Sequence, residues 1–142
     1  MKHTFLSLFI SLLLFTCSKN NVDKNCNFLL NIGVNTSINL SLPQYSQLQF
    51  ASNSVYVVNA GNGGIIVTNS GTGYLAWDAS DPNHVPSSCS RLNVSGLEGK
   101  CGCSDENLYS LITGQPLGNG DLRCGLKAYR VEQSGNSLII TN

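Results

Sequence analysis

Short apolar segments that alternate with polar residues run through most of this 142-residue chain, and this alternation restricts its possible folds more than any other feature. In the clearest case, Ile38, Leu40 and Leu42 are separated by single polar residues, and Pro43 ends the segment. A period of two places such side chains on one face of a β-strand. No stretch of helical length shows a helical period. The other expected strands lie at 48–50, 55–58, 65–68, 74–78, 92–94, 108–111, 126–131 and 138–141.

The segments between these strands are rich in glycine, asparagine and serine, which favour tight turns. The segment 59–64 reads Asn-Ala-Gly-Asn-Gly-Gly. It lacks the Gly-x-Gly-x-x-Gly spacing of a phosphate-binding loop and no helical pattern follows it, so we expect a hairpin turn. About ten short strands joined by turns predict an all-β sandwich or barrel.

The N-terminus has the pattern of an export signal. Lys2 and His3 precede an apolar run from 5 to 15, which is shorter than the ~20 residues of a membrane-spanning helix. The run ends in Leu-Phe-Thr-Cys, with the cysteine at Cys17, and a polar stretch follows. This arrangement resembles a bacterial lipobox. We therefore expect a signal peptide at 1–16, and a lipidated Cys17 that begins a polar tether at 17–27.

These assignments place the mature protein in the cell envelope, exported and anchored to a bacterial membrane by acyl chains on Cys17. The alternative is an ordinary cleaved signal that precedes an incidental cysteine. Either signal leads to an oxidising compartment, where disulfides form. Without Lys2 the chain has seven Lys and Arg residues against eight Asp and Glu, and the basic residues are not clustered. We therefore expect no nucleic-acid partner, and the sequence identifies no protein partner.

Two polar loops hold most of the residues that are able to bind a metal. The first, 78–89, reads Asp-Ala-Ser-Asp-Pro-Asn-His-Val-Pro-Ser-Ser-Cys, and the second, 101–111, reads Cys-Gly-Cys-Ser-Asp-Glu-Asn-Leu-Tyr-Ser-Leu. Thr-Gly-Gln-Pro-Leu follows at 113–117, and Leu-Lys-Ala-Tyr-Arg-Val at 126–131. This succession resembles the Rieske [2Fe–2S] iron–sulfur domain family, and is most similar to small bacterial Rieske-like lipoproteins.

The resemblance implies a Rieske-like antiparallel β-sandwich or barrel over 28–142, with a two-loop tip within 79–124. In the family, each loop supplies one cysteine and one histidine to the cluster, and a further cysteine from each loop forms a disulfide between them. By this resemblance Cys101 matches a ligand cysteine, and His84 lies near a ligand histidine with one extra residue in the spacing. Cys89 and Cys103 match the disulfide pair.

Two of the ligand positions have changed. Asp81 stands where the first-loop ligand cysteine belongs, and Ser104 where the second-loop histidine belongs. A Rieske centre needs two cysteines and two histidines, but His84 is the only histidine that remains once His3 leaves with the signal peptide. The sequence therefore predicts a Rieske-like module that has lost its cluster, with these four positions as a degenerate site. We expect no resident metal or cofactor and no catalysis.

Two alternatives from other classes remain open. One is an electron-transfer component of an oxidoreductase system that keeps a [2Fe–2S] cluster through altered ligands. The other is a mononuclear zinc site. Both would draw on Asp81, His84, Cys101 and Cys103, with His84 and Cys101 as the first choices. A hydrolase lacks support, because the chain has no Gly-x-Ser-x-Gly motif and only one histidine to serve a nucleophile.

Five cysteines follow Cys17, so at least one is left unpaired. Beside the Cys89–Cys103 bridge that the resemblance implies, the sequence leaves the pairing of Cys26, Cys101 and Cys124 open. We expect the loops 81–90 and 101–107 to lie side by side at one tip of the domain.

Overall fold

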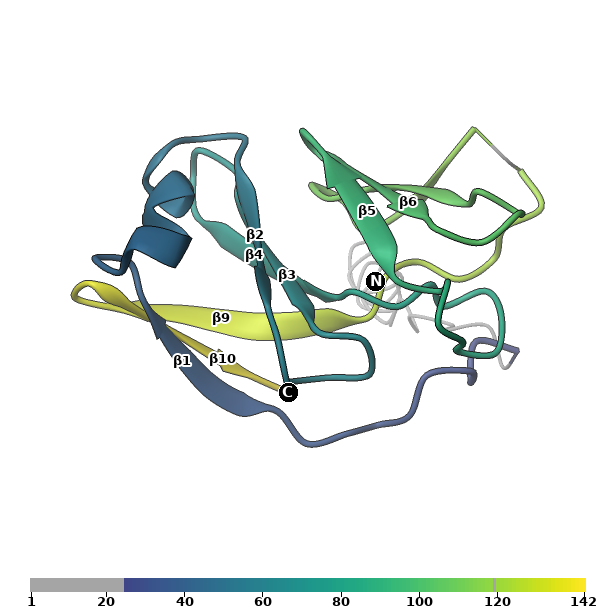
Figure 1. Cartoon of the computed structure of the whole chain (residues 1–142), viewed down its shortest axis with the longest axis horizontal. Coiled ribbons are helices and arrows are strands. Elements are labelled where there is room, and N and C mark those ends of the chain that lie inside the picture. The colour runs from purple at the N-terminus through teal and green to yellow at the C-terminus, as the bar shows by residue number, and fades with distance from the viewer. Residues whose placement is uncertain (1–24, 119) are drawn as a thin grey trace, which may run out of the picture.

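The computed structural model describes residues 25–118 and 120–142, and within them the chain forms ten strands and one 3-10 helix (Figure 1). The predicted signal peptide, Cys17 and the tether as far as residue 24 lie outside the described residues. None of the helical structure in the described part has the length and apolar character that a membrane crossing requires. The elements are β1 (Asn35–Asn39), η2 (Pro43–Gln49), β2 (Ser54–Val57), β3 (Ile65–Asn69), β4 (Tyr74–Asp78), β5 (Leu92–Ser95), β6 (Glu98–Cys101), β7 (Leu108–Ser110), β8 (Pro116–Leu117), β9 (Ala128–Ser134) and β10 (Ser137–Thr141).

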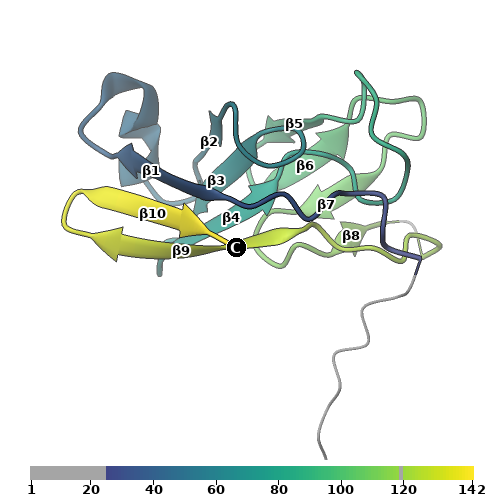
Figure 2. The same ribbon diagram turned by 90° about the horizontal axis from the view of Figure 1, so that it is seen from below.

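The strands form two antiparallel sheets, as the all-β prediction requires. The larger has the order β1-β10-β9-β4-β3-β2, and the smaller has the order β5-β6-β7-β8. In both views the smaller sheet lies beyond one end of the larger one (Figures 1 and 2). The chain enters the smaller sheet from β4 and returns from it to β9, which pairs with β4. The smaller sheet is thus an insertion between two neighbouring strands of the larger one.

Strand β3 contributes to two separate hydrophobic cores. Ile65 and Val67 pack with β1, β9 and β10, whereas Ile66 packs towards the smaller sheet. All three side chains are fully buried. A strand that is covered on both faces reads as a continuous apolar run, and the sequence at 65–67 is of this kind.

The 3-10 helix η2 is an element that the sequence analysis did not predict. The alternation led us to expect a strand that reaches Leu42 and a further strand at 48–50. Instead β1 ends at Asn39, and Pro43 stands at the start of a helix that buries Leu48 and leaves Phe50 exposed. Proline has no N–H and its φ is already near the helical value, so it suits a first helical turn. The prediction of strand at 48–50 was therefore wrong.

The 59–64 segment is a turn between antiparallel β2 and β3, as expected, and it covers a buried carboxylate at the end of β4. Asp78 accepts hydrogen bonds from the backbone N–H of Asn62 (2.7 Å), the amide of the same residue (2.9 Å), and the Tyr129 hydroxyl (2.6 Å). Burial and then the hydrogen bond to Asp78 raise the pKa of Tyr129. A buried charge must be hydrogen-bonded, and the donors to Asp78 come from the turn and from β9. The carboxylate at the end of β4 therefore joins these three parts of the fold.

Gly114, in the Gly-x-Pro segment after β7, allows the two sheets to meet at Trp77. The indole N–H donates to Leu111 O (2.9 Å). Gly114 has φ of +70°, and a Cβ there would lie 2.5 Å from the indole ring. Both the backbone conformation and the contact therefore require glycine.

We predict that Gly114→Ala destabilises the domain by about 1–3 kcal/mol more than Gly135→Ala does, because overpacking against a ring adds to the cost of a positive φ. Gly135 is a matched control, since its φ is +59° and a Cβ there has no neighbour within 4 Å. Urea unfolding of both variants measures the difference. Equal losses of stability would contradict the packing argument.

Candidate functional site

Backbone hydrogen bonds close both polar loops and hold their bases together. In the first loop, Asp81 N–H donates to Ser90 O (2.9 Å) and Leu92 N–H to Ala79 O (2.8 Å). In the second, Cys101 N–H donates to the carbonyl of Asn107 (2.8 Å). The loops are neighbours because the strands that carry them pair, with Leu92 opposite Cys101. They lie side by side, as the sequence predicts.

Two disulfides hold this region. Cys89 and Cys103 join the two loops, with Cα atoms 4.9 Å apart, and this is the pairing that the resemblance implies. Cys26 and Cys124 form the second bridge, which settles the pairing that the sequence leaves open. Contacts with the folded domain therefore begin inside the predicted 17–27 tether. Among the described residues Cys101 is the free cysteine.

Asp81 is a fully buried carboxylate that binds groups from both loops. Oδ1 accepts from the Tyr109 hydroxyl (2.6 Å) and from Asn83 N–H (2.8 Å), and Oδ2 accepts from the Asn107 amide (2.9 Å). The bond from Asn83 is the turn contact expected of an Asp-Pro-Asn sequence. Burial and the hydrogen bond to Asp81 raise the pKa of Tyr109, so the phenol stays a donor.

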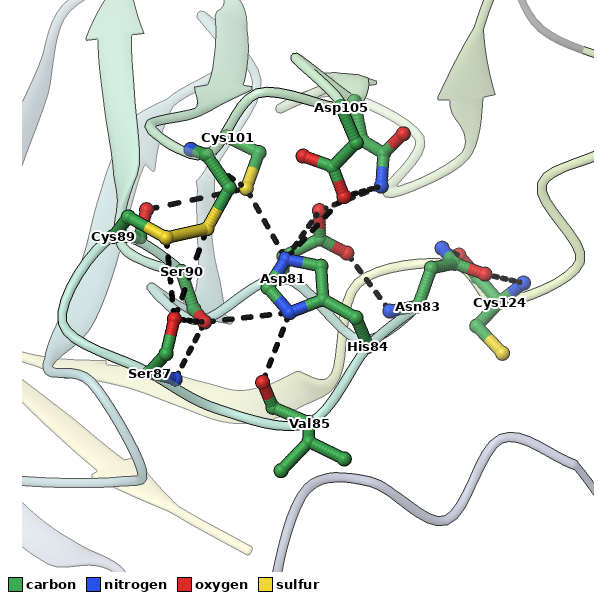
Figure 3. A network of polar contacts seen from close by, with 12 residues as sticks. Asp81, Asn83, His84, Val85, Ser87, Cys89, Ser90, Cys101, Asp105 and Cys124 are labelled. Atoms are coloured by element: carbon green, nitrogen blue, oxygen red, sulfur yellow. Dashed lines mark hydrogen bonds and ion pairs between the residues drawn. A yellow bond between two sulfur atoms is a disulfide. The ribbon is translucent and has the colours of Figure 1, made fainter.

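His84 extends from the first loop towards the second (Figure 3). Its Nδ1 lies 3.0 Å from Val85 O and 3.4 Å from Ser90 Oγ. A carbonyl oxygen only accepts, so Nδ1 carries a proton and donates it to Val85 O. The other ring nitrogen, Nε2, points towards Cys101 and lies 3.3 Å from its sulfur atom.

Cys101 is a buried thiol, 2% exposed. Burial, together with the carboxylates of Asp81 and Asp105, raises its pKa to about 12, although the Cys103 N–H opposes the shift by donating to the sulfur. At neutral pH the side chain is therefore a neutral thiol when no metal is bound. Such a thiol is a weak nucleophile, which agrees with the absence of a hydrolase motif.

The structure brings three of the four degenerate positions together, namely Asp81, His84 and Cys101, whereas Ser104 is exposed. Its neighbour Asp105 takes a place in the group, with Oδ2 3.5 Å from His84 Nε2. The sequence analysis did not select Asp105. Its only sequence signal is its position beside Ser104, in a loop that already carried the ligand pattern.

A single amide orients both carboxylates towards His84. The Asn107 amide nitrogen donates to Asp81 Oδ2 at 2.9 Å and to Asp105 Oδ2 at 3.1 Å. These are the same two oxygen atoms that face His84 Nε2. Asn107 is buried, and sequence reasoning missed it, because an asparagine in a turn-rich loop is usually a turn residue.

Comparison with solved structures identifies the fold. One chain of the complex of reduced oxygenase and oxidized ferredoxin in carbazole 1,9a-dioxygenase aligns with a TM-score of 0.50 and 14% identity, covering 79% of this chain and 94% of that chain. A putative NADH-dependent nitrite reductase small subunit from Mycobacterium tuberculosis is 17% identical (TM-score 0.47, 79% and 97% covered). The ferredoxin of carbazole 1,9a-dioxygenase from Nocardioides aromaticivorans is 16% identical (0.47, 74% and 96%). No family model and no curated protein matches the sequence.

The protein therefore has the Rieske-like β fold that the sequence resemblance implied, including its antiparallel sheets. At these identities the likeness concerns the fold alone. What the two loops can bind has to be argued from their own side chains.

The side chains of the tip do not fit a Rieske [2Fe–2S] cluster, which takes two thiolates on one iron and two imidazoles on the other. The site offers one thiol and one imidazole, and Cys103, the other cysteine in reach, is bonded to Cys89. Asp81, at the first-loop cysteine position, offers a carboxylate oxygen, which is a hard donor where the cluster needs a soft thiolate.

We predict that Asp81→Asn lowers the free energy of unfolding by about 2–4 kcal/mol, because an amide gives one acceptor oxygen to three buried donors. Glu132→Gln is the matched control, because Glu132 is exposed on β9 and forms an ion pair with the exposed side chain of Arg130. It should change stability by less than about 0.5 kcal/mol. Chemical unfolding followed by fluorescence measures both, and an Asp81→Asn protein as stable as the control would contradict the role of the carboxylate.

Proposed function

We propose that this protein is an envelope-anchored lipoprotein whose Rieske-like domain has lost the [2Fe–2S] cluster and acts as a non-catalytic binding module. The observation that carries the proposal is the state of Asp81. A residue at a former ligand position is fully buried and hydrogen-bonded to Tyr109, Asn83 and Asn107. A carboxylate in this network takes over the connection between the loops that a cluster would otherwise supply.

An electron-transfer role through altered ligands has less support from this geometry. It would require Cys103 to leave the disulfide with Cys89 and to join Cys101 as a second thiolate. Even then, the site would have one imidazole from His84 in place of the two that a Rieske centre uses. We therefore favour a module in which the loops keep their arrangement and bind something other than the cluster.

The cluster-free state is tested by anaerobic purification of the mature protein from membranes in detergent, followed by iron and acid-labile sulfide analysis and a visible spectrum. We expect iron and sulfide far below the two of each per chain that a [2Fe–2S] protein contains. A Rieske ferredoxin purified in the same way is the positive control. Stoichiometric iron and sulfide with charge-transfer bands would overturn the proposal.

The anchor is tested separately, because it rests on the sequence around Cys17. Cells that express the full chain are fed an alkyne-labelled fatty acid, and the protein is isolated and reacted with a fluorescent azide. We expect label on the wild-type protein and none on Cys17→Ser, since the acyl chains need that sulfur and its N-terminal position. Cys101→Ser is the matched control and should keep the label. Label that persists on Cys17→Ser would exclude lipidation at this residue.

A further inference from the structure

The donor atoms around His84 Nε2 are spaced like the ligands of a tetrahedral metal ion. Its Nε2 lies 3.3 Å from Cys101 Sγ, 3.5 Å from Asp105 Oδ2 and 3.6 Å from Asp81 Oδ2. Both carboxylate oxygens are at ion-pair distance from this nitrogen, beyond the ~2.7–3.2 Å of a nitrogen-to-oxygen hydrogen bond. Ligands around a tetrahedral zinc ion stand about 3.3–3.6 Å apart, given bonds of about 2.0–2.3 Å to the metal. The measured separations agree with that spacing.

The surroundings of His84 support the same interpretation. Its Nδ1 donates to Val85 O, and its Nε2 faces two carboxylate oxygens and a sulfur. A hydrogen bond from the far ring nitrogen of a histidine to a carbonyl is the usual support of a metal-bound imidazole.

We infer that the two-loop tip binds one Zn²⁺ ion through His84 Nε2, Cys101 Sγ and Asp105 Oδ2, with Asp81 Oδ2 in the fourth position. The first three belong to a group whose donor atoms all lie within 4.8 Å of one another. This inference rests on the proposed loss of the iron–sulfur cluster and names what the module binds. It differs from the zinc site that the sequence suggests, because Asp105 replaces Cys103, whose sulfur is in the disulfide.

The donor set favours zinc over other common ions. Mg²⁺ and Ca²⁺ prefer oxygen ligands alone, and Cu(I) prefers thiolates and thioethers. One thiolate, one imidazole and two carboxylates are accepted tetrahedral ligands of Zn²⁺. Binding replaces the proton of the Cys101 thiol with a bond to the metal, and that proton leaves to the solvent. The His84 side chain is 24% exposed and that of Asp105 38%, which gives the ion a path of entry.

The mature protein, purified from membranes in detergent with its disulfides intact and stripped of metal by a chelator, is titrated with ZnCl₂ and separately with CoCl₂. We expect one ion per chain, and a Co²⁺ complex with the visible bands of tetrahedral cobalt and a thiolate-to-cobalt charge-transfer band. Cys101→Ser should abolish the charge-transfer band. Asp105→Asn should weaken Zn²⁺ binding by about tenfold or more.

Glu132→Gln, the same type of change on an exposed strand, should bind Zn²⁺ as the wild type does. If Cys101→Ser fails to fold, the exposed position of Asp105 makes Asp105→Asn the deciding variant. Zinc that does not bind the wild type at micromolar concentrations, or that binds Asp105→Asn equally well, overturns the inference. Iron and sulfide are measured on the same preparation before the chelator is added. A protein that has no cluster and does not bind added zinc refutes the zinc site alone, whereas a cluster refutes the proposed function.

Discussion

The buried carboxylate of Asp81 is the constraint on which the tip of this molecule depends. A charge with no exposure to water is tolerated only when hydrogen bonds replace its hydration. Here the donors come from both loops, with Asn83 on one side and Asn107 and Tyr109 on the other. These hydrogen bonds to Asp81 form together only when the two loops are held in one relative position. The Cys89–Cys103 disulfide then limits their separation in the unfolded chain as well.

A second buried carboxylate, three residues earlier, performs the same task for the larger sheet. Asp78 accepts from the turn at 59–64 and from Tyr129 on β9. Each aspartate has a tyrosine donor at 2.6 Å, and in each pair burial and the hydrogen bond to the carboxylate raise the pKa of the phenol. The end of β4 therefore positions both the junction between the sheets and the first loop. The site is therefore attached to a strand end that buried hydrogen bonds hold in place.

The sequence predicted the parts of the fold that follow from hydrophobic period, such as β3 and β4, and it missed those that follow from pairing alone. Strand β6 reads Glu-Gly-Lys-Cys and has no alternation of apolar residues, yet it pairs with β5 and β7 on either side. The site divides in the same way. Local turn chemistry explains the bond between Asp81 and Asn83, but the burial of Asp81 depends on Tyr109, 28 residues away, and no local pattern reveals that contact.

The pairing of the cysteines shows why a thiol remains at the centre of the tip. A disulfide restricts the unfolded chain more when it closes a longer loop. The two bridges observed span 14 and 98 residues, whereas a bond between Cys101 and Cys103 would span only two. Cys101 also lies at the end of β6, in the core of the smaller sheet, where water and oxidants have little access. A soft donor is thereby kept in its thiol form beside an imidazole and two carboxylates. A free cysteine is often buried as a small apolar side chain, so it is the imidazole and the carboxylates beside Cys101 that agree with the ligand role we infer.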